Sequence, residues 1–186
     1  MILRTVVTEP AEEPVTRAEA KAYAQIGHTD LDDQFDIAIS AARQRIERET
    51  NRAMVDTVFD QLFPAWPGDD MLYLLPHPVS VVGSIKYIDS DGVQQTLSTD
   101  VYDVQLGAQP VAVHLKYQQV WPTIRGDRYP VTIRYTAGYG AAATVPGALK
   151  AAVMILTEHL VMNPDCSDLP AAVAAIVASY RVEPIT

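Results

Sequence analysis

Residues 121–160 read WPTIRGDRYPVTIRYTAGYGAAATVPGALKAAVMILTEHL, and they decide the fold because a strand, a glycine turn and a helix follow one another. Apolar and polar side chains alternate along residues 131–139, as they do in a half-buried strand. Gly138-Tyr139-Gly140 predicts the end of that strand. Pro146 predicts the first turn of a helix, with Thr144 upstream as its cap. Apolar residues then follow at helical spacing: Leu149, Val153, Leu156 and Leu160. One face of this helix must therefore be buried.

The composition predicts a chain with a sizeable core and an acidic surface. Its 186 residues suffice for one domain, or a domain with a subdomain, and 48% of them are apolar. The formal charge of −9 disfavours tight binding of duplex DNA, since that affinity comes mainly from neutralised phosphates. No apolar run approaches the roughly 20 residues of a membrane span, and the N-terminus lacks the apolar region of a signal peptide. We therefore expect synthesis in the cytoplasm and no membrane contact.

Two helices are predicted after a charged, extended lead-in of residues 1–15. The first begins with a capping box, Thr16-Arg17-Ala18-Glu19, and should end at Gly27. The second begins near residues 29–32, with acidic residues in the early turns where the helix dipole favours them. Its apolar stripe consists of Leu31, Phe35, Ala38, Ile39, Ala42 and Ile46. The other face carries Arg43, Arg45, Glu47, Arg48 and Glu49, which we expect to form a solvated or inter-subunit surface.

From Met54 onward the apolar period changes from about 3.6 to 2, which is typical of strands. Strands are expected near residues 58–63, 71–75, 79–89, 94–97, 101–106 and 111–117. A hairpin turn at residues 89–92 joins two of them. After the helix that Pro146 begins, Ser167 or Asp168 can cap a last helix with Pro170 in its first turn. Its apolar side consists of Val173, Ile176, Val177 and Tyr180.

These elements predict an α+β fold in which N-terminal and C-terminal helices pack together, with a central antiparallel β-sheet or small β-sandwich inserted between them. The expected segments are residues 1–53 (lead-in and helices), 54–140 (β-rich middle) and 141–186 (C-terminal helices and tail). The two helical segments should form one domain.

Motifs for chemistry are mostly absent from the sequence. The glycines around Gly138 fit neither dinucleotide nor phosphate-loop spacing, so a strand-to-helix turn is favoured over a nucleotide site. Asp89, Asp91 and Gly92 resemble the start of a calcium loop, but the completing glutamate is missing. The four histidines are scattered singly, and the single Cys166 excludes a disulfide framework. We therefore predict no catalytic, cofactor or metal site.

Several short motifs occur in a fixed order along nearly the whole chain. They are PVTRAEAK at 14–21, AAR at 41–43 with Ile46-Glu47 and Thr50, LPHPV at 75–79, YID at 87–89 with Gly92, Trp121-Pro122, VTIRYTAGYG at 131–140, Val145-Pro146, and KAA at 150–152. In this order they resemble the phage head-tail connector (adaptor) family, including the related gene transfer agent adaptors.

The resemblance implies a non-enzymatic protein of the virion neck. Members form a ring of about twelve copies below the portal. The ring extends the DNA channel, lets DNA pass without specific binding, and links the head to the stopper and tail proteins. The C-terminal end is expected to reach the portal protein, which gives the candidate portal-binding residues Tyr180, Arg181, Val182, Glu183, Pro184 and Ile185.

The helices are expected to carry the ring, which gives the candidate ring-interface residues Arg43, Arg45, Arg48, Glu49 and Arg52. Two alternatives from other classes stay open at this point. One is a small homo-oligomeric scaffold unrelated to phage. The other is an uncharacterised hydrolase-like or nucleotide-binding enzyme of the β-rich middle, which would depend on Asp89, Asp91 or His114. Trp66 and Trp121 fit either sheet-edge anchors or interface aromatics.

Overall fold

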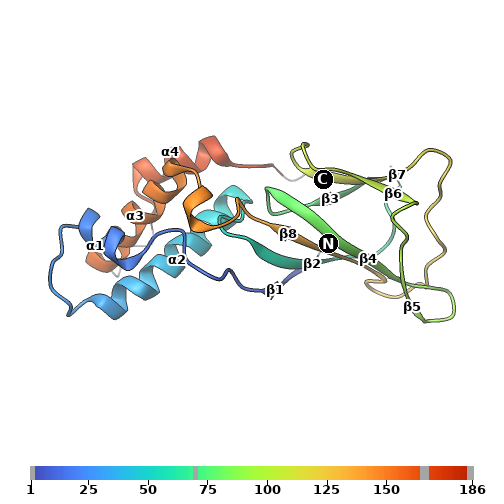
Figure 1. Cartoon of the computed structure of the whole chain (residues 1–186), viewed down its shortest axis with the longest axis horizontal. Coiled ribbons are helices and arrows are strands. Elements are labelled where there is room, and N and C mark those ends of the chain that lie inside the picture. The colour runs from blue at the N-terminus through green and yellow to red at the C-terminus, as the bar shows by residue number, and fades with distance from the viewer. Residues whose placement is uncertain (1–2, 69–70, 164–167, 184–186) are drawn as a thin grey trace. The chain divides into compact units, whose positions relative to one another are not determined.

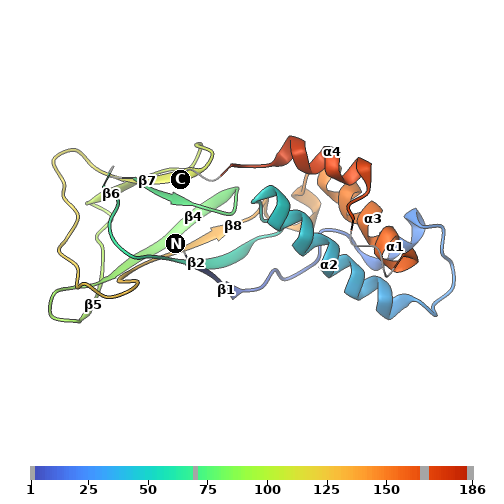
Figure 2. The ribbon, with the colours of Figure 1, turned by 180° about the vertical axis from the view of Figure 1, so that it is seen from behind.

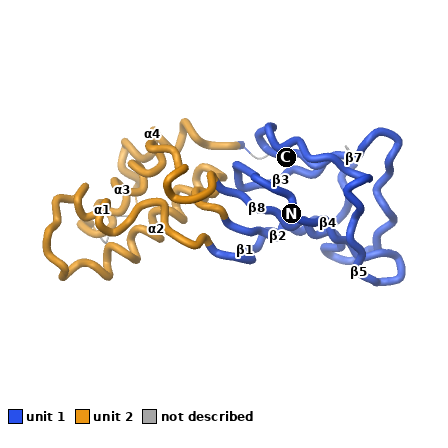
Figure 3. The backbone as a smooth tube through the Cα atoms, in the orientation of Figure 1, with its two compact units in different colours: residues 1–9, 57–138, 183–186 blue, residues 10–56, 139–182 orange. Residues whose placement is uncertain are grey.

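The computed structural model describes residues 3–68, 71–163 and 168–183. The chain divides into two compact units, drawn in different colours in Figure 3. Unit 1 contains residues 1–9, 57–138 and 183–186, and unit 2 contains residues 10–56 and 139–182. Unit 2 is therefore built from two separate stretches of chain, and both are helical.

In unit 2 the helices are α1 (Arg17–Tyr23), α2 (Asp32–Thr50), α3 (Gly147–Met162) and α4 (Ala171–Tyr180), with a short 3₁₀ turn at Ala142–Thr144 (Figure 1). Helix α2 packs against the other three helices. The predicted stripes supply the buried core, which includes Phe35, Ile39, Ala42, Ile46, Leu149, Val153, Leu156, Val173 and Val177. The apolar periodicity of the sequence thus correctly predicted which helix faces are buried.

The capping box at the start of α1 is present as predicted. The Glu19 backbone N–H donates to Thr16 Oγ1 at 3.2 Å, and the Thr16 N–H donates to Glu19 Oε2 at 2.7 Å. The Thr16 hydroxyl also donates to Glu19 Oε2 at 2.7 Å, and the hydrogen bonds from the Thr16 N–H and hydroxyl lower the pKa of Glu19. The helix ends at Tyr23, earlier than the predicted Gly27, because Gln25 turns the chain with a φ of 57°.

The predicted start of α2 is confirmed: the helix begins at Asp32, with Asp32 and Asp33 in its first turn. Two other predicted helix starts are wrong in detail. Pro146 and Pro170 occupy the residue before α3 and α4, and not the first turn. The Thr144 hydroxyl lies 2.7 Å from the carbonyl oxygens of Tyr139 and Ala141, so it stabilises the preceding turn and does not cap α3.

Unit 1 contains a five-stranded sheet in the order β1-β2-β8-β4-β5. The strands are β1 (Leu3–Thr8), β2 (Thr57–Phe63), β8 (Val131–Ala137), β4 (Val79–Ile88) and β5 (Gln94–Thr96), and every neighbouring pair is antiparallel. Strand β8 buries alternate residues, as its sequence predicted. Residues 1–15 were predicted to form an extended, charged lead-in, and the pairing of residues 3–8 with β2 as strand β1 was not predicted.

A second sheet has the order β3-β7-β6, with β3 (Met71–Leu74), β7 (Val111–Leu115) and β6 (Tyr102–Gln105). The two sheets lie one over the other in both views (Figures 1 and 2). Side chains of the first sheet contact the second sheet and the residue after it: Gln61 Nε2 donates to the Tyr73 carbonyl in β3 at 2.9 Å, and the Tyr135 hydroxyl donates to the carbonyl of Leu75, which follows β3. The predicted α+β class with antiparallel sheets is confirmed.

Candidate functional site

The residues considered for a reaction centre form turns and strands. Asp89 Oδ1 accepts the N–H groups of Asp91 and Val93 at 3.0 and 2.9 Å, as in an ordinary hairpin turn. The hydrogen bond from Gln95 is the main reason that the pKa of Asp89 is lowered. His114 lies on β7, in the other sheet. In the described parts of the chain, no group of three His, Cys, Asp or Glu residues is arranged to hold a metal ion.

The glycine turn after β8 already has a hydrogen-bond partner within the protein. The Gly140 N–H donates to Asp56 Oδ1 at 3.1 Å, so an acidic side chain takes the place where an anion would bind. Gly140 has a φ of 103°, and a Cβ there would lie 2.9 Å from Thr144 Oγ1. The strand-to-helix turn therefore requires glycine for backbone geometry.

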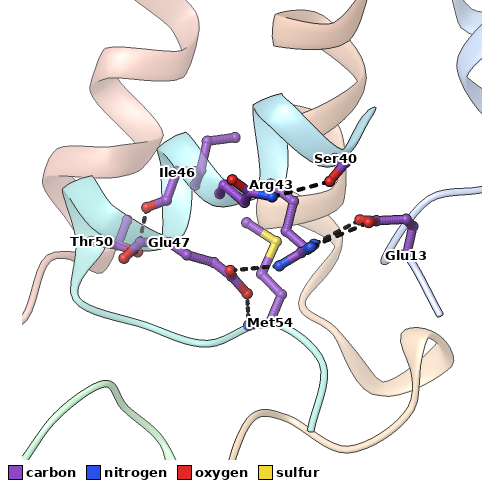
Figure 4. Close-up of polar contacts among 8 residues, drawn as sticks. Glu13, Ser40, Arg43, Ile46, Glu47, Thr50 and Met54 are labelled. Carbon is purple, nitrogen blue, oxygen red and sulfur yellow. Dashed lines mark hydrogen bonds and ion pairs between the residues drawn. The ribbon is translucent and has the colours of Figure 1, made fainter. Parts of the chain in front are cut away.

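A buried charge network ties residue 13 to α2 (Figure 4). Arg43 Nε donates to Glu13 Oε2 at 2.7 Å, and Arg43 Nη1 donates to Glu47 Oε2 at 2.9 Å. Glu47 Oε1 also accepts the Met54 N–H at 2.7 Å, which holds the chain after α2. The Arg43 side chain is only 7% exposed. The prediction of a solvated or inter-subunit surface is therefore wrong at Arg43 and Glu47, because their opposite charges are paired inside the subunit.

The ionisation of this network follows from burial and pairing. Burial raises the pKa of Glu47, although the Met54 N–H and Arg43 oppose the effect. Burial also disfavours the charged form of Arg43, but the hydrogen bond with Glu13 and the charge of Glu47 raise the pKa of Arg43. The positive charge of Arg43 therefore stabilises two carboxylates, and only a small part of the Arg43 side chain is accessible to another subunit.

A second cluster fixes the end of α4 and is called the C-terminal anchor below; it comprises Thr50, Asn51, Arg52, Tyr180 and Val182. Arg52 Nε donates to the Tyr180 carbonyl at 2.6 Å, and the guanidinium lies 5.8 Å from the Tyr180 ring centroid. The Val182 N–H donates to the Thr50 carbonyl at 2.9 Å, and Asn51 Nδ2 donates to the Val182 carbonyl at 2.8 Å. Asn51 adopts a left-handed conformation with a φ of 54°.

The anchor corrects part of the predicted portal-binding segment. Val182 is 5% exposed, so its side chain is buried in its own subunit and the segment available to a partner is shorter than predicted. Tyr180 is half-buried, whereas Arg181 and Glu183 are exposed. Pro184 and Ile185 lie outside the described residues.

The other predicted ring-interface residues differ in exposure. Arg48 is exposed, and Arg45 and Glu49 are partly exposed. Arg52 belongs to the C-terminal anchor and also donates to the Tyr139 hydroxyl at 3.0 Å. The helix period places Arg45, Arg48 and Glu49 on the accessible side of α2, and this part of the predicted surface is available to a neighbouring protein.

Sequence reasoning missed an exposed surface on β1. All six residues of this strand are exposed, including the apolar Leu3, Val6 and Val7. The alternation of apolar residues in LRTVVT is weak, and only the adjacent proline and glutamates stood out in the sequence. A β-branched run next to a polar segment was the signal that could have indicated a strand.

The two tryptophans pack against each other. Their rings are stacked with centroids 4.5 Å apart and planes inclined by 8°, and Trp66 Nε1 donates to the Pro122 carbonyl at 2.8 Å. The stacked rings favour a role of the two tryptophans as an anchor, which holds the long segment between β7 and β8. Tyr117 and Val120 in that segment are 89% and 78% exposed.

No helix in the described ranges has both the length and the apolar character of a membrane span. A sequence model of the head completion protein family matches residues 14–165 of this chain. No curated protein matches it significantly.

Three solved structures have a similar fold, each over 99% of this chain and 97% of the other chain. They are the neck of an empty gene transfer agent (GTA) particle computed with C6 symmetry (TM-score 0.84, 21% identity), the virion of a native GTA particle (TM-score 0.81, 23% identity), and the neck of a native GTA particle computed with C12 symmetry (TM-score 0.75, 23% identity). The likeness extends through both units.

Proposed function

This chain belongs to the head completion protein family, and we propose that it is an adaptor at the neck of a tailed phage or phage-like particle. It is a structural protein of the particle and not an enzyme. The observation that carries the proposal is the family match across residues 14–165, joined to a fold shared with neck proteins over 99% of the chain. Asp89 and His114, which were considered for a reaction, lie in a hairpin turn and in strand β7.

The adaptor would form a ring of about twelve copies below the portal and extend the DNA channel. Two of the three similar structures come from necks reconstructed with C6 and C12 symmetry, which supports a cyclic arrangement. A cyclic ring needs two different surfaces on each subunit, one for each neighbour. Arg45, Arg48 and Glu49 on α2 are proposed for one such contact because they are accessible and carry both signs of charge.

The C-terminal end is proposed to bind the portal protein, and the other end of the ring would receive the stopper or tail proteins. Support comes from the C-terminal anchor, which holds Tyr180 and Val182 and so determines where the following residues leave unit 2. Arg181 and Glu183 are exposed beside it. A segment that starts from a fixed point loses less conformational entropy when it binds a partner.

The negative charge suits passage of DNA through the ring. A formal charge of −9 per subunit repels a polyanion unless the lumen is locally basic, so the wall would not retain the passing duplex.

Cryo-electron microscopy of particles tests the proposal. Particles from a strain with this gene intact should show a ring of this fold between portal and tail, and particles from a deletion strain should have filled heads without attached tails. Tailed particles in the deletion strain, or a neck without this fold, would refute the adaptor role.

A further inference from the structure

Strand β1 has an open sheet edge that is regular from Leu3 to Val6 and ends at a β-bulge between Val6 and Thr8. The strand spans six residues, compared with three in β5 and four in β3 and β6, which also lie at sheet edges. Leu3, Val6 and Val7 are 39%, 47% and 43% exposed. Proteins usually protect such edges with proline, charge or a covering segment, because an open edge pairs with other strands. The sequence LRTVVT has no proline, and its single charge, Arg4, lies 5.7 Å from the Phe59 ring of its own sheet.

The direction of the backbone groups on β1 follows from the sheet register. The Gly138 N–H donates to Pro78 on the β4 side, and the Pro130 carbonyl accepts from Ile88, so even-numbered residues around β8 bond toward β4. Odd-numbered residues of β8 therefore bond toward β2, since the direction alternates along a strand.

The same alternation carries through β2 to β1. Strand β2 pairs Gln61 with Ile133, so its odd-numbered residues bond toward β8 and its even-numbered residues toward β1. Asp60 pairs with Thr5, and the residues on either side of Thr5 thus direct their N–H and C=O groups away from the sheet. These two residues are Arg4 and Val6.

The opposite end of the same sheet has a matching edge. The Asp89 N–H donates to Val93 and the Leu97 N–H donates to Ile85, so odd-numbered residues around β5 bond toward β4. Gln94 and Thr96 therefore direct their backbone groups outward, with the same two-residue spacing as Arg4 and Val6. Val93, just before β5, is 54% exposed and offers an apolar contact.

We propose that the open edge of β1 binds the open edge of β5 in the adjacent copy of this chain. The five-stranded sheet would then continue from one subunit to the next, and the inference rests on the ring proposed above. A head-to-tail ring needs two different and complementary surfaces on one subunit, and the two ends of one sheet satisfy this condition. The occupant is a second copy because both edges that must pair are present in every subunit.

The strand directions are consistent with a cyclic ring. Four antiparallel steps separate β1 from β5, so the two strands have the same polarity within the sheet. Rotation about the ring axis preserves the component of each strand that lies along the axis, so strands with a large axial component meet between copies as a parallel pair. In a parallel pair, alternate residues of each strand supply the hydrogen bonds, as Arg4, Val6, Gln94 and Thr96 can do.

A proline substitution tests the outward backbone N–H group separately from the side chain. Val6→Pro removes an outward N–H and leaves the β1–β2 hydrogen bonds intact, since proline is tolerated where an edge N–H faces outward. Val6→Thr is the matched control because it keeps the N–H and the β-branched shape. Both variants are expressed in the particle-producing strain that lacks the native gene, and circular dichroism of each purified subunit confirms folding. Arg4→Pro replaces Val6→Pro if the latter fails to fold.

The expected result is loss of the neck ring in particles with Val6→Pro and a normal ring with Val6→Thr. Normal rings with a folded Val6→Pro subunit would overturn the inference while leaving the adaptor role intact. Absence of a ring in wild-type particles would instead refute the proposed function itself.

Cross-linking identifies the occupant of the β1 edge. Val6→Cys and Gln95→Cys, which lie opposite each other when Arg4 and Val6 bond Gln94 and Thr96, are combined in a chain with Cys166→Ser, and assembled particles are treated with a short bifunctional thiol reagent. A ladder of covalent multimers of this chain on denaturing gels is expected, with none for either cysteine alone. Rings without the ladder, or Val6→Cys captured by a different particle protein, would overturn the pairing with β5.

Discussion

Replacing Arg43 by methionine should strongly destabilise the helical unit. The substitution keeps an apolar side chain of similar length but leaves Glu13 and Glu47 without their cation, and the Glu47 side chain is only 18% exposed. Removing one partner of a buried ion pair costs about 3 to 5 kcal/mol. Glu13 is 33% exposed and regains water, so the lower end of this range is expected.

The loss of stability should depend on pH. Burial already raises the pKa of Glu47 above its ordinary value of 4.5, and loss of Arg43 would raise it further. A carboxyl group with a raised pKa in the folded state contributes stability that is fully present below pH 4.5 and is lost as the pH rises through the folded pKa. The deficit of Arg43→Met relative to wild type should therefore be largest near about pH 8 and smaller near about pH 5.

Urea denaturation followed by circular dichroism measures both effects. Arg48→Met is the matched control, because Arg48 is exposed on the same helix, and it should change the free energy of unfolding by less than about 0.5 kcal/mol. Adding Glu47→Gln to Arg43→Met should recover part of the loss. The reasoning would be refuted if Arg43→Met matched Arg48→Met in stability, or if its deficit grew on acidification.

Three further predictions follow from other parts of the chain. Deleting residues 184–186 should leave the melting temperature unchanged but weaken co-sedimentation with portal rings, whereas a deletion that also removes Val182 should cost about 2 to 4 kcal/mol; equal stability of the two truncations would contradict the anchor. Tyr135→Phe should cost about 1 to 3 kcal/mol in urea denaturation, because the Leu75 carbonyl loses its donor, and an unchanged midpoint would count against that bond. Assembled rings should not retain duplex DNA in gel-shift assays at low salt, and tight retention would contradict a repelling channel.

The parts of the fold that the sequence predicted are those with a strong apolar period. Strand β8 alternates from Val131 to Ala137, and α2 repeats buried residues from Phe35 to Ile46, so each pattern determined the element and its buried face. The hairpin at Asp89 was equally clear, because its side chain bonds the turn locally. Such features depend on near neighbours in the chain.

The parts that were wrong depend on distant partners. Strand β1 exists because it pairs with β2, more than fifty residues later in the chain. Arg43 is buried because Glu13 approaches it from another segment, and periodicity alone assigns an arginine to the solvent. Val182 is buried because its backbone N–H donates to the Thr50 carbonyl and its carbonyl accepts from the Asn51 side chain, both at the end of α2. The sequence alone does not show which of these distant residues lie close together in the fold.

The central claim is that this chain acts by forming a ring in the neck of a phage-like particle. A cryo-electron microscopy reconstruction of the neck of particles that encode it tests the claim most directly. We expect a closed ring of this fold between the portal and the tail, with the C-terminal ends of the subunits directed at the portal. A neck reconstruction in which this chain is missing, or present as isolated copies without mutual contact, would contradict it.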